Sequence, residues 1–161
     1  MIYMGIDPGQ KGGIAVLRVN SDSEFVSEAE AYPYSNEKLK ELAYNLTLDW
    51  SDNVFCMVEK VGAMPGQGVT SMFNFGANFG YILGVLEANQ VPYELVSPQK
   101  WKKHFSLTNE KSLSVKVCKK LFPNLSLLPT SRCHKESDGM AEAALIALYA
   151  KRTDNGTTIK K

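Results

Sequence analysis

The stretch IYMGIDPG, residues 2–9, decides the fold of this chain. Residues 2–6 are apolar or small and predict a short buried strand, and Pro8-Gly9 predicts a turn directly after Asp7. A carboxylate at the end of a buried strand is costly to remove from water unless a cation or hydrogen-bond donors compensate its charge. The position of Asp7 therefore favours a bound metal ion or a cationic ligand.

Outward from this stretch, apolar runs and turn residues alternate in an order typical of an α/β domain. Strands are expected over residues 1–7, 13–19, 24–33, 53–59 and 92–96. Helices are expected over residues 36–48, 70–90, 98–104, 109–122 and 136–152. The expected N-caps are Ser35, Thr70 or Ser71, Ser97, and Thr108 or Asn109. One domain over residues 1–152 and a polar tail over residues 153–161 follow from this order.

The composition fits a single domain with an ordinary core, because 44% of the 161 residues are apolar. The first apolar run is interrupted by Asp7, so no N-terminal signal is expected, and no run approaches the roughly 20 apolar residues of a membrane span. Cys56, Cys118 and Cys133 lack the paired spacing of a zinc site. They are interpreted as reduced thiols of a cytoplasmic protein.

The net charge of +1 conceals two halves of opposite sign. Residues 1–94 contain five Lys/Arg and twelve Asp/Glu, whereas residues 95–161 contain thirteen and five. The basic half suits a polyanion such as nucleic acid, and a solvated helical surface is the equally weighted alternative. The candidate phosphate contacts are Lys100, Lys102, Lys103, Lys111 and Lys116. Trp101 is expected to be buried beneath them.

Two further acids occupy positions like that of Asp7. Glu59 follows a buried strand, so its carboxylate meets that of Asp7 if the two strands are parallel neighbours. An ion pair of Glu59 with Lys60 or Lys11 is the alternative. Asp138 begins a helix and lies on the apolar stripe that faces the sheet, although an acid in a first turn also interacts favourably with the helix dipole.

Three converging carboxylates repel one another unless a cation lies between them, and hard oxygen ligands suit Mg²⁺ or Mn²⁺. Two such ions about 4 Å apart can activate a water molecule and stabilise the leaving oxygen of a phosphodiester. Together with the basic half of the chain, the acids predict a metal-dependent nuclease.

The chain resembles the RuvC family of Holliday-junction resolvases from about residue 1 to 152. The resemblance rests on the motifs around Asp7, Val58-Glu59 and residues 138–143. The segments 59–76 and 92–102 resemble the bacteriophage branch. The resemblance implies a ribonuclease-H-like fold, a five-stranded mixed sheet flanked by helices. It also implies a homodimer that cuts two opposed strands of a four-way DNA junction and uses Mg²⁺, for which Mn²⁺ can substitute. Such a protein is expected in the cytoplasm of a bacterial cell, and its gene can come from a phage.

Carried over by position, Asp7, Glu59 and Asp138 match metal ligands of that family. The family usually has a fourth acid three residues before the one matched by Asp138, but this chain has Lys135 there. Glu136 is the favoured replacement, because an acid replaces an acid, and His134 is the second candidate.

Two other segments carry expectations linked to this resemblance. The loop after Glu59 is either a plain connection or a segment from which Met64 or Gln67 enters an opened junction. The helix over residues 70–90 carries a row of small and aromatic residues, expected to pack partly on the sheet and partly on a twin helix of a dimer. This row is Phe73, Ala77, Gly80, Gly84 and Ala88.

Three other functions compete with strict resolution of junctions. A branched-DNA-binding protein with weak or no cleavage is kept open by the lysine at position 135. A less specific debranching nuclease would use the same acids on forks and flaps. A kinase-like ATPase fragment is suggested by the first motif alone and ranks lowest.

Overall fold

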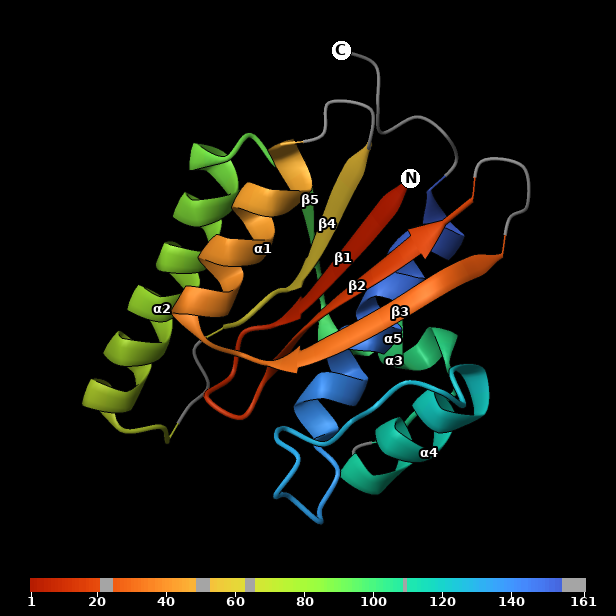
Figure 1. Ribbon diagram of the computed structural model, residues 1–161. Coiled ribbons are helices and arrows are strands. Elements are labelled where there is room, and N and C mark those ends of the chain that lie inside the picture. Colours follow the sequence, from red (N-terminus) through yellow and green to blue (C-terminus); the bar gives the residue numbers. More distant parts are fainter. Residues whose placement is uncertain (21–24, 49–52, 63–65, 109, 155–161) are drawn as a thin grey trace.

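The computed structural model describes residues 1–20, 25–48, 53–62, 66–108 and 110–154. Five strands form one mixed sheet in the order β3-β2-β1-β4-β5, as expected. The strands are β1 (Ile2–Asp7), β2 (Gly13–Val19), β3 (Val26–Pro33), β4 (Val54–Glu59) and β5 (Tyr93–Val96). β1, β2 and β3 are antiparallel neighbours, whereas β4 runs parallel to both β1 and β5. The open central sheet therefore has β1 in the middle, as Figure 1 shows.

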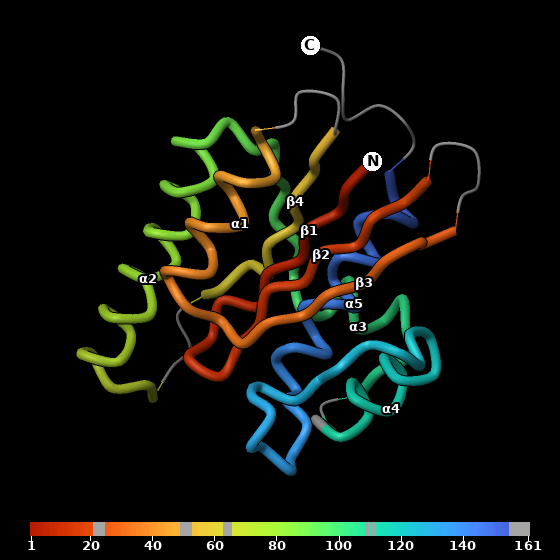
Figure 2. Tube along the Cα trace, viewed as in Figure 1, coloured from red at the N-terminus to blue at the C-terminus, as the bar shows by residue number. Residues whose placement is uncertain are grey.

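Helices cover both faces of this sheet, which gives a three-layer domain (Figure 1). The helices on one face are α1 (Asn36–Leu48) and α2 (Val69–Ala88). The helices on the other face are α3 (Pro98–His104), α4 (Lys111–Leu121) and α5 (Asp138–Thr153). The tube in Figure 2 shows α1 and α2 side by side, with α5 on the opposite side of β1. The α/β class and the single domain predicted from the sequence are confirmed.

Alternation along β1 and β4 decides which face each side chain meets. Ile2, Met4 and Ile6 belong to the core beneath α1 and α2. Tyr3 belongs to the core beneath α5, so Gly5 and Asp7, two and four residues further, face the same way. The residues of β1 before Asp7 carry no charge on either face of the sheet. Asp7 therefore brings the first charge of this strand to the face covered by α5.

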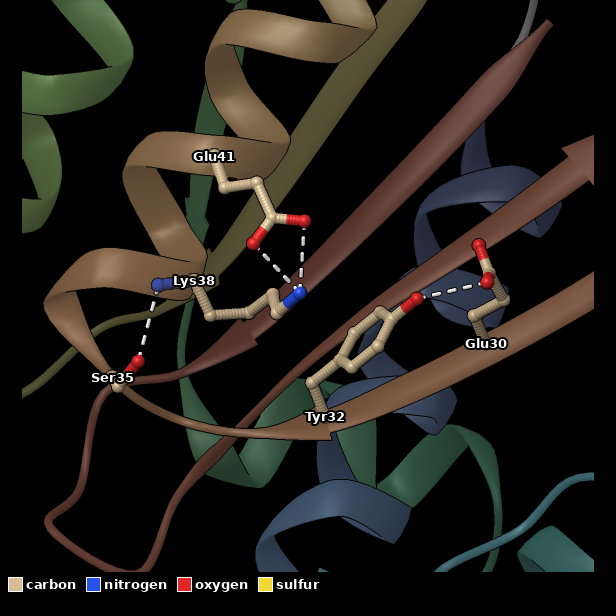
Figure 3. Close-up of polar contacts among 5 residues, drawn as sticks. All are labelled: Glu30, Tyr32, Ser35, Lys38 and Glu41. Atoms are coloured by element: carbon tan, nitrogen blue, oxygen red, sulfur yellow. Dashed lines mark hydrogen bonds and ion pairs between the residues drawn. The ribbon is translucent and has the colours of Figure 1, made fainter.

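Figure 3 shows the polar contacts at the start of α1 and in the edge strand β3, and the Lys38 ammonium over the Tyr32 ring joins the two elements. Ser35 Oγ accepts a hydrogen bond from Lys38 N at 3.1 Å, so Ser35 is the expected N-cap. The Lys38 ammonium forms an ion pair with Glu41 at 2.8 Å and lies 4.6 Å from the ring centroid of Tyr32. Tyr32 in turn donates to Glu30 at 2.8 Å.

Several expected boundaries shift by one to three residues. Ser97 is the N-cap of α3 as predicted, but Gly68 precedes α2 and Glu110 precedes α4. Thr70 and Ser71 lie inside α2, so the N-cap prediction for that helix was wrong. α5 continues to Thr153 and Asp154 accepts a hydrogen bond from Tyr3 Oη, so ordered contacts extend two residues beyond the expected end at 152. Asn109 and residues 155–161 lie outside the described residues.

The row of small and aromatic residues on α2 does not divide between two partners as expected. Phe73 is 75% exposed, and Ala77, Gly80, Gly84 and Ala88 are exposed as well. The helix is anchored from its other side by Ile82 and Leu86, which are fully buried against the α1 side of the sheet. The whole row therefore faces away from the core, because the branched residues are the ones that fill the space next to the sheet.

α5 packs on β1 at closer than ordinary range, which the small residues on both elements allow. A Cβ atom added to Gly5 would overlap the Ala143 carbonyl oxygen and the Ala147 amide nitrogen. Further along, Gly139 lies against the backbone of Lys11 and Gly12 in the β1–β2 turn. These contacts fix both the distance of α5 from the sheet and its position along β1.

Gly5→Ala is expected to destabilise the protein by about 3 kcal/mol, because the backbone of α5 cannot move without disturbing the core. Gly62→Ala is the matched control: Gly62 is exposed and an added Cβ meets nothing within 4 Å, so its change should stay within about 0.5 kcal/mol. Urea unfolding of both variants measures the difference. Equal stabilities would show that α5 does not press on β1 as described.

Candidate active site

Asp7 and Glu59 end adjacent strands at the same edge of the sheet. β1 and β4 are parallel neighbours with Ile6 paired to Val58, so the two acids follow that pair side by side. Phe55 and Met57 belong to the core beneath α5, so by alternation Glu59 faces α5, as Asp7 does. The condition set by the sequence, that the two strands be parallel neighbours, is confirmed.

Glu142 on α5 is the third acid that the structure brings to this position. Its carboxylate raises the pKa of both Asp7 and Glu59, and its side chain is only 14% exposed. Glu142 Oε1 accepts a hydrogen bond from Ser114 Oγ at 3.0 Å and lies 3.3 Å from Lys102 Nζ. We refer to Asp7, Glu59 and Glu142 as the acid cluster.

Sequence reasoning missed Glu142 as a site residue, although a usable signal was present. It follows Asp138 by four residues, which places both acids on one face of α5. That face was already expected to meet the sheet, because alanines and leucines follow Asp138 at helical spacing. An acid inside such an apolar stripe is as unusual as an acid at the end of a buried strand.

The acid cluster strongly disfavours three simultaneous negative charges. Burial, followed by the charges of Glu59 and Glu142, raises the pKa of Asp7 from its usual 3.8 to about 7, against smaller lowering effects of the Gly9 amide and Lys102. Burial and Glu142 also raise the pKa of Glu59, which Trp101 and Lys102 partly oppose. Perturbation of this kind by burial and like charges is typical of functional sites and is relieved by a cation.

Each acid of the cluster is held through one oxygen. Asp7 Oδ1 accepts from Gly9 N at 3.3 Å, and Glu59 Oε2 accepts from Trp101 Nε1 at 2.6 Å. The contacts of Glu142 with Ser114 and Lys102 both go to Oε1. Since no buried side-chain oxygen among the described residues lacks a partner, the second oxygen of each acid remains accessible to solvent.

Asp138 is the first residue of α5, and Ser137 caps this helix by accepting a hydrogen bond from Met140 N at 3.2 Å. The contact of Gly139 with Gly12 places Asp138 next to the turn that follows Asp7. The structure thus brings Asp138 to the same end of the sheet as the acid cluster, as the sequence predicted.

Neither of the two candidates for the fourth ligand is among the groups that shift the pKa of Asp7 or Glu59. The Glu136 carboxylate forms an ion pair with Lys119 of α4, with the two atoms 2.7 Å apart. His134 is exposed in the segment before α5. The acid that acts on Asp7 and Glu59 is Glu142, not Glu136.

The donor chemistry of the site fits a divalent cation. Its ligands would be carboxylate oxygens, which suit Mg²⁺ and Mn²⁺, and each acid of the cluster has one oxygen to offer. Within the part of the chain that the structure describes, no three His, Cys, Asp or Glu residues form a preassembled metal cluster. The acids instead stay apart around the Lys102 ammonium, which lowers the pKa of Asp7 and Glu59 and is paired with Glu142.

The predicted DNA contacts fall into three groups. Lys100, Lys103 and Lys116 are exposed, whereas Lys102 turns toward Glu142. Gln67 lines a groove of about 1020 Å³ beside Pro8, the residue after Asp7. The other lining residues include Tyr34, which precedes α1, and Asn74 and Phe75 of α2. Met64 and the side chain of Lys111 lie outside the described residues.

Comparison with known proteins gave matches among solved structures. No protein-family model and no curated protein matches the chain. Thermus thermophilus RuvC in complex with a Holliday junction substrate matches with a TM-score of 0.65 and 16% identity, over 99% of each chain. Fowlpox virus resolvase in complex with Holliday junction DNA matches with a TM-score of 0.56 and 15% identity, over 95% of this chain and 98% of that chain. The yeast mitochondrial Holliday junction resolvase matches with a TM-score of 0.52 and 17% identity, over 92% of this chain and 77% of that chain.

The fold and these matches define the class, an α/β protein with a ribonuclease-H-like fold. Within that class, the chain has the fold shared by RuvC and the viral and mitochondrial resolvases, which confirms the resemblance found in the sequence. At 15–17% identity the likeness establishes the fold, so the reaction must be inferred from the residues of the site.

Proposed function

We propose that this protein is a Mg²⁺-dependent endonuclease that cuts branched DNA and resolves four-way junctions. The observation that carries the proposal is the acid cluster, in which Asp7 and Glu59 at the ends of β1 and β4 meet Glu142 of α5 within a RuvC-like fold. The solved structures with this fold include resolvases in complex with Holliday junction DNA, which supports branched DNA as the substrate.

The divalent ions would be held by Asp7, Glu59, Asp138 and Glu142. Four acids are enough to hold two ions. Bound ions of this kind supply activation of water and stabilisation of the leaving oxygen. We propose Glu142 rather than Glu136 or His134 as the fourth ligand, because Glu136 is paired with Lys119 and His134 is exposed. No protein nucleophile is required.

The chain's basic residues would position the DNA phosphates. Lys100 and Lys103 of α3 and Lys116 of α4 are exposed on the face of the sheet that carries the acid cluster. Lys102 instead compensates the charge of the acid cluster through its ion pair with Glu142. Binding to DNA should therefore weaken steeply as salt rises, through the exposed lysines.

The proposal is tested by incubating the full chain with four-way, three-way, flap and linear DNA in Mg²⁺, Mn²⁺ or EDTA, and mapping the cuts. Paired, opposed nicks in the four-way junction that require a divalent ion are expected. Cutting of all branched forms at equal rates would instead identify a debranching nuclease. Binding of the junction without cleavage in either Mg²⁺ or Mn²⁺ would identify a junction-binding protein. The ion pair between Lys102 and Glu142 within the cluster is the observation that favours this second candidate function.

We further propose that the protein acts as a homodimer through α2. Only Ile82 and Leu86 of this 20-residue helix are buried, although, contrary to the expectation from the sequence, it is long and apolar enough to cross a membrane by length and composition. The exposed glycines 76, 80 and 84 leave open space around their Cα atoms, so another backbone can approach closely. A second copy offers the same row, and a two-fold axis between two such helices would bury both. Ile82 and Leu86 tie α2 to the core of the domain, which favours a protein partner over a membrane.

Phe73→Glu is expected to convert the dimer to a monomer, because it places a charge on the one large apolar side chain of the row in the proposed contact. Tyr44→Glu is the matched control, since Tyr44 of α1 is also an exposed aromatic residue but lies outside the α2 row. Light scattering after size-exclusion chromatography measures both masses. A monomeric parent protein, or loss of the dimer in both variants, would count against α2 as the interface.

A further inference from the structure

Trp101 lies at the centre of the contact between α3 and the site. It is the fourth residue of α3 and is fully buried in the core formed with α5. Its indole Nε1–H donates a hydrogen bond of 2.6 Å to Glu59 Oε2. A buried tryptophan usually finds a partner for its N–H, but here the partner is a carboxylate of the acid cluster.

This hydrogen bond restricts a side chain that would otherwise be mobile. Glutamate has three rotatable bonds, whereas Glu59 is held by a ring whose own position is fixed by packing on all sides. The bond uses Oε2 and leaves Oε1 accessible to solvent. It also favours the ionised form of Glu59, because the N–H donates to the carboxylate.

The neighbouring residue Lys102 links α3 to a second acid of the cluster. Lys102 Nζ lies 3.3 Å from Glu142 and 5.2 Å from the ring centroid of Trp101. One turn of α3 thus holds Glu59 from the sheet and Glu142 from α5. A tryptophan that only filled the core would not need its N–H directed at the site.

We propose that Trp101 is a positioning residue for Glu59, and that its indole N–H increases the affinity of the acid cluster for a divalent cation. The inference rests on the cation site of the proposed function but does not depend on DNA cleavage. Hydrogen-bond donors behind a metal ligand typically contribute a 10- to 100-fold effect on metal affinity. Loss of the N–H alone should therefore weaken Mn²⁺ binding about tenfold.

The test measures Mn²⁺ binding to the full chain by calorimetry without DNA. Trp50→Phe leaves Trp101 as the only indole, because the sequence contains two tryptophans. In this background, Trp101 is replaced by 3-benzothienylalanine, which has the same shape with sulfur in place of N–H, or by 7-azatryptophan, which keeps the N–H. The first protein should bind Mn²⁺ about tenfold more weakly and the second within about twofold of the parent.

A spectroscopic measurement separates positioning from stability. Addition of Mg²⁺ to the Trp50→Phe protein should shift the emission of Trp101, because the ion changes the charge next to the indole. The benzothienylalanine protein loses a hydrogen bond to a carboxylate and should unfold at a lower urea concentration than the azatryptophan protein, but both should be fully folded without urea, where the Mn²⁺ affinities are compared. Equal Mn²⁺ affinities in these two proteins would overturn the inference.

The outcomes distinguish this inference from the proposed function. Absence of Mn²⁺ binding by the parent protein would remove the cation site, and with it both. Tight Mn²⁺ binding that ignores the indole N–H would overturn only the role of Trp101. Weakened binding in the benzothienylalanine protein, without cleavage of any DNA by the parent, would support the role of Trp101 and overturn the nuclease.

Discussion

Asp7→Asn is expected to abolish junction cleavage and, without divalent ions, to make the folded protein more stable at pH 8. Both effects have the same cause, because the carboxylate that would bind the ion is costly when the ion is absent. Burial and the charges of Glu59 and Glu142 raise the pKa of Asp7 from 3.8 to about 7. Asparagine has a similar shape, but it carries no charge and is a weaker ligand for Mg²⁺.

The pH dependence of this stability has a definite sign. A raised pKa means that the folded protein holds the Asp7 proton more tightly than the unfolded chain does. The stabilising effect is complete below about pH 4 and is lost as the pH rises to about 7. Above pH 7 the folded protein carries the full penalty, with an upper limit of about 4 kcal/mol for a shift of this size. Asp7→Asn removes the penalty.

Urea unfolding of parent and Asp7→Asn protein in EDTA measures this effect at pH 4 and pH 8. The variant should be more stable at pH 8, and the two should converge at pH 4. Mg²⁺ at pH 8 should stabilise only the parent protein, so the stability advantage of the Asp7→Asn variant should shrink or reverse. Cleavage by the variant at the parental rate, or a stability difference independent of pH, would contradict the assignment of Asp7.

Glu142→Gln is expected to reduce junction cleavage by at least about 100-fold, whereas Glu136→Gln should change it by less than about threefold. Glutamine at position 142 can still accept the hydrogen bond from Ser114, so the helix contact is kept while the charge is lost. Glutamine at position 136 loses the surface ion pair with Lys119, which contributes less than about 1 kcal/mol to stability.

Rates of cutting of a four-way junction at saturating Mg²⁺ measure both variants under the same conditions. The Mg²⁺ concentration at half-maximal rate should rise for Glu142→Gln and remain unchanged for Glu136→Gln. If Glu136→Gln proved to be the inactive variant, the segment before α5 would have to rearrange on DNA binding, and the fourth ligand predicted from the sequence would be right.

The sequence predicted the sheet, and with it the meeting of Asp7 and Glu59, for a simple physical reason. Asp7 and Glu59 end apolar runs bounded by turn residues, and this local pattern determines both strand and exit point. Parallel pairing of β1 and β4 then brings the two acids together. Asp138 could be placed because its helix has an apolar stripe of regular spacing.

The position of the fourth acid depends on contacts between distant segments. Glu136 is paired with Lys119, 17 residues earlier, and no local pattern reveals that pairing. Glu142 reaches the cluster because α5 lies directly on Gly5, a contact between residues more than 130 positions apart. The same argument explains the error on α2, where helical spacing identified the row but not the face on which it lies.

The close contact of α5 with β1 has a consequence for the newly made chain on the ribosome. β1 is synthesised first and α5 last among the described elements, yet the acid cluster needs both. Until α5 emerges, Gly5 has no covering helix and Glu142 is missing, so an unfinished polypeptide has no complete cluster. A nuclease assembled in this order would be inert throughout translation, and messages cut short would release no active fragment into a cell full of DNA.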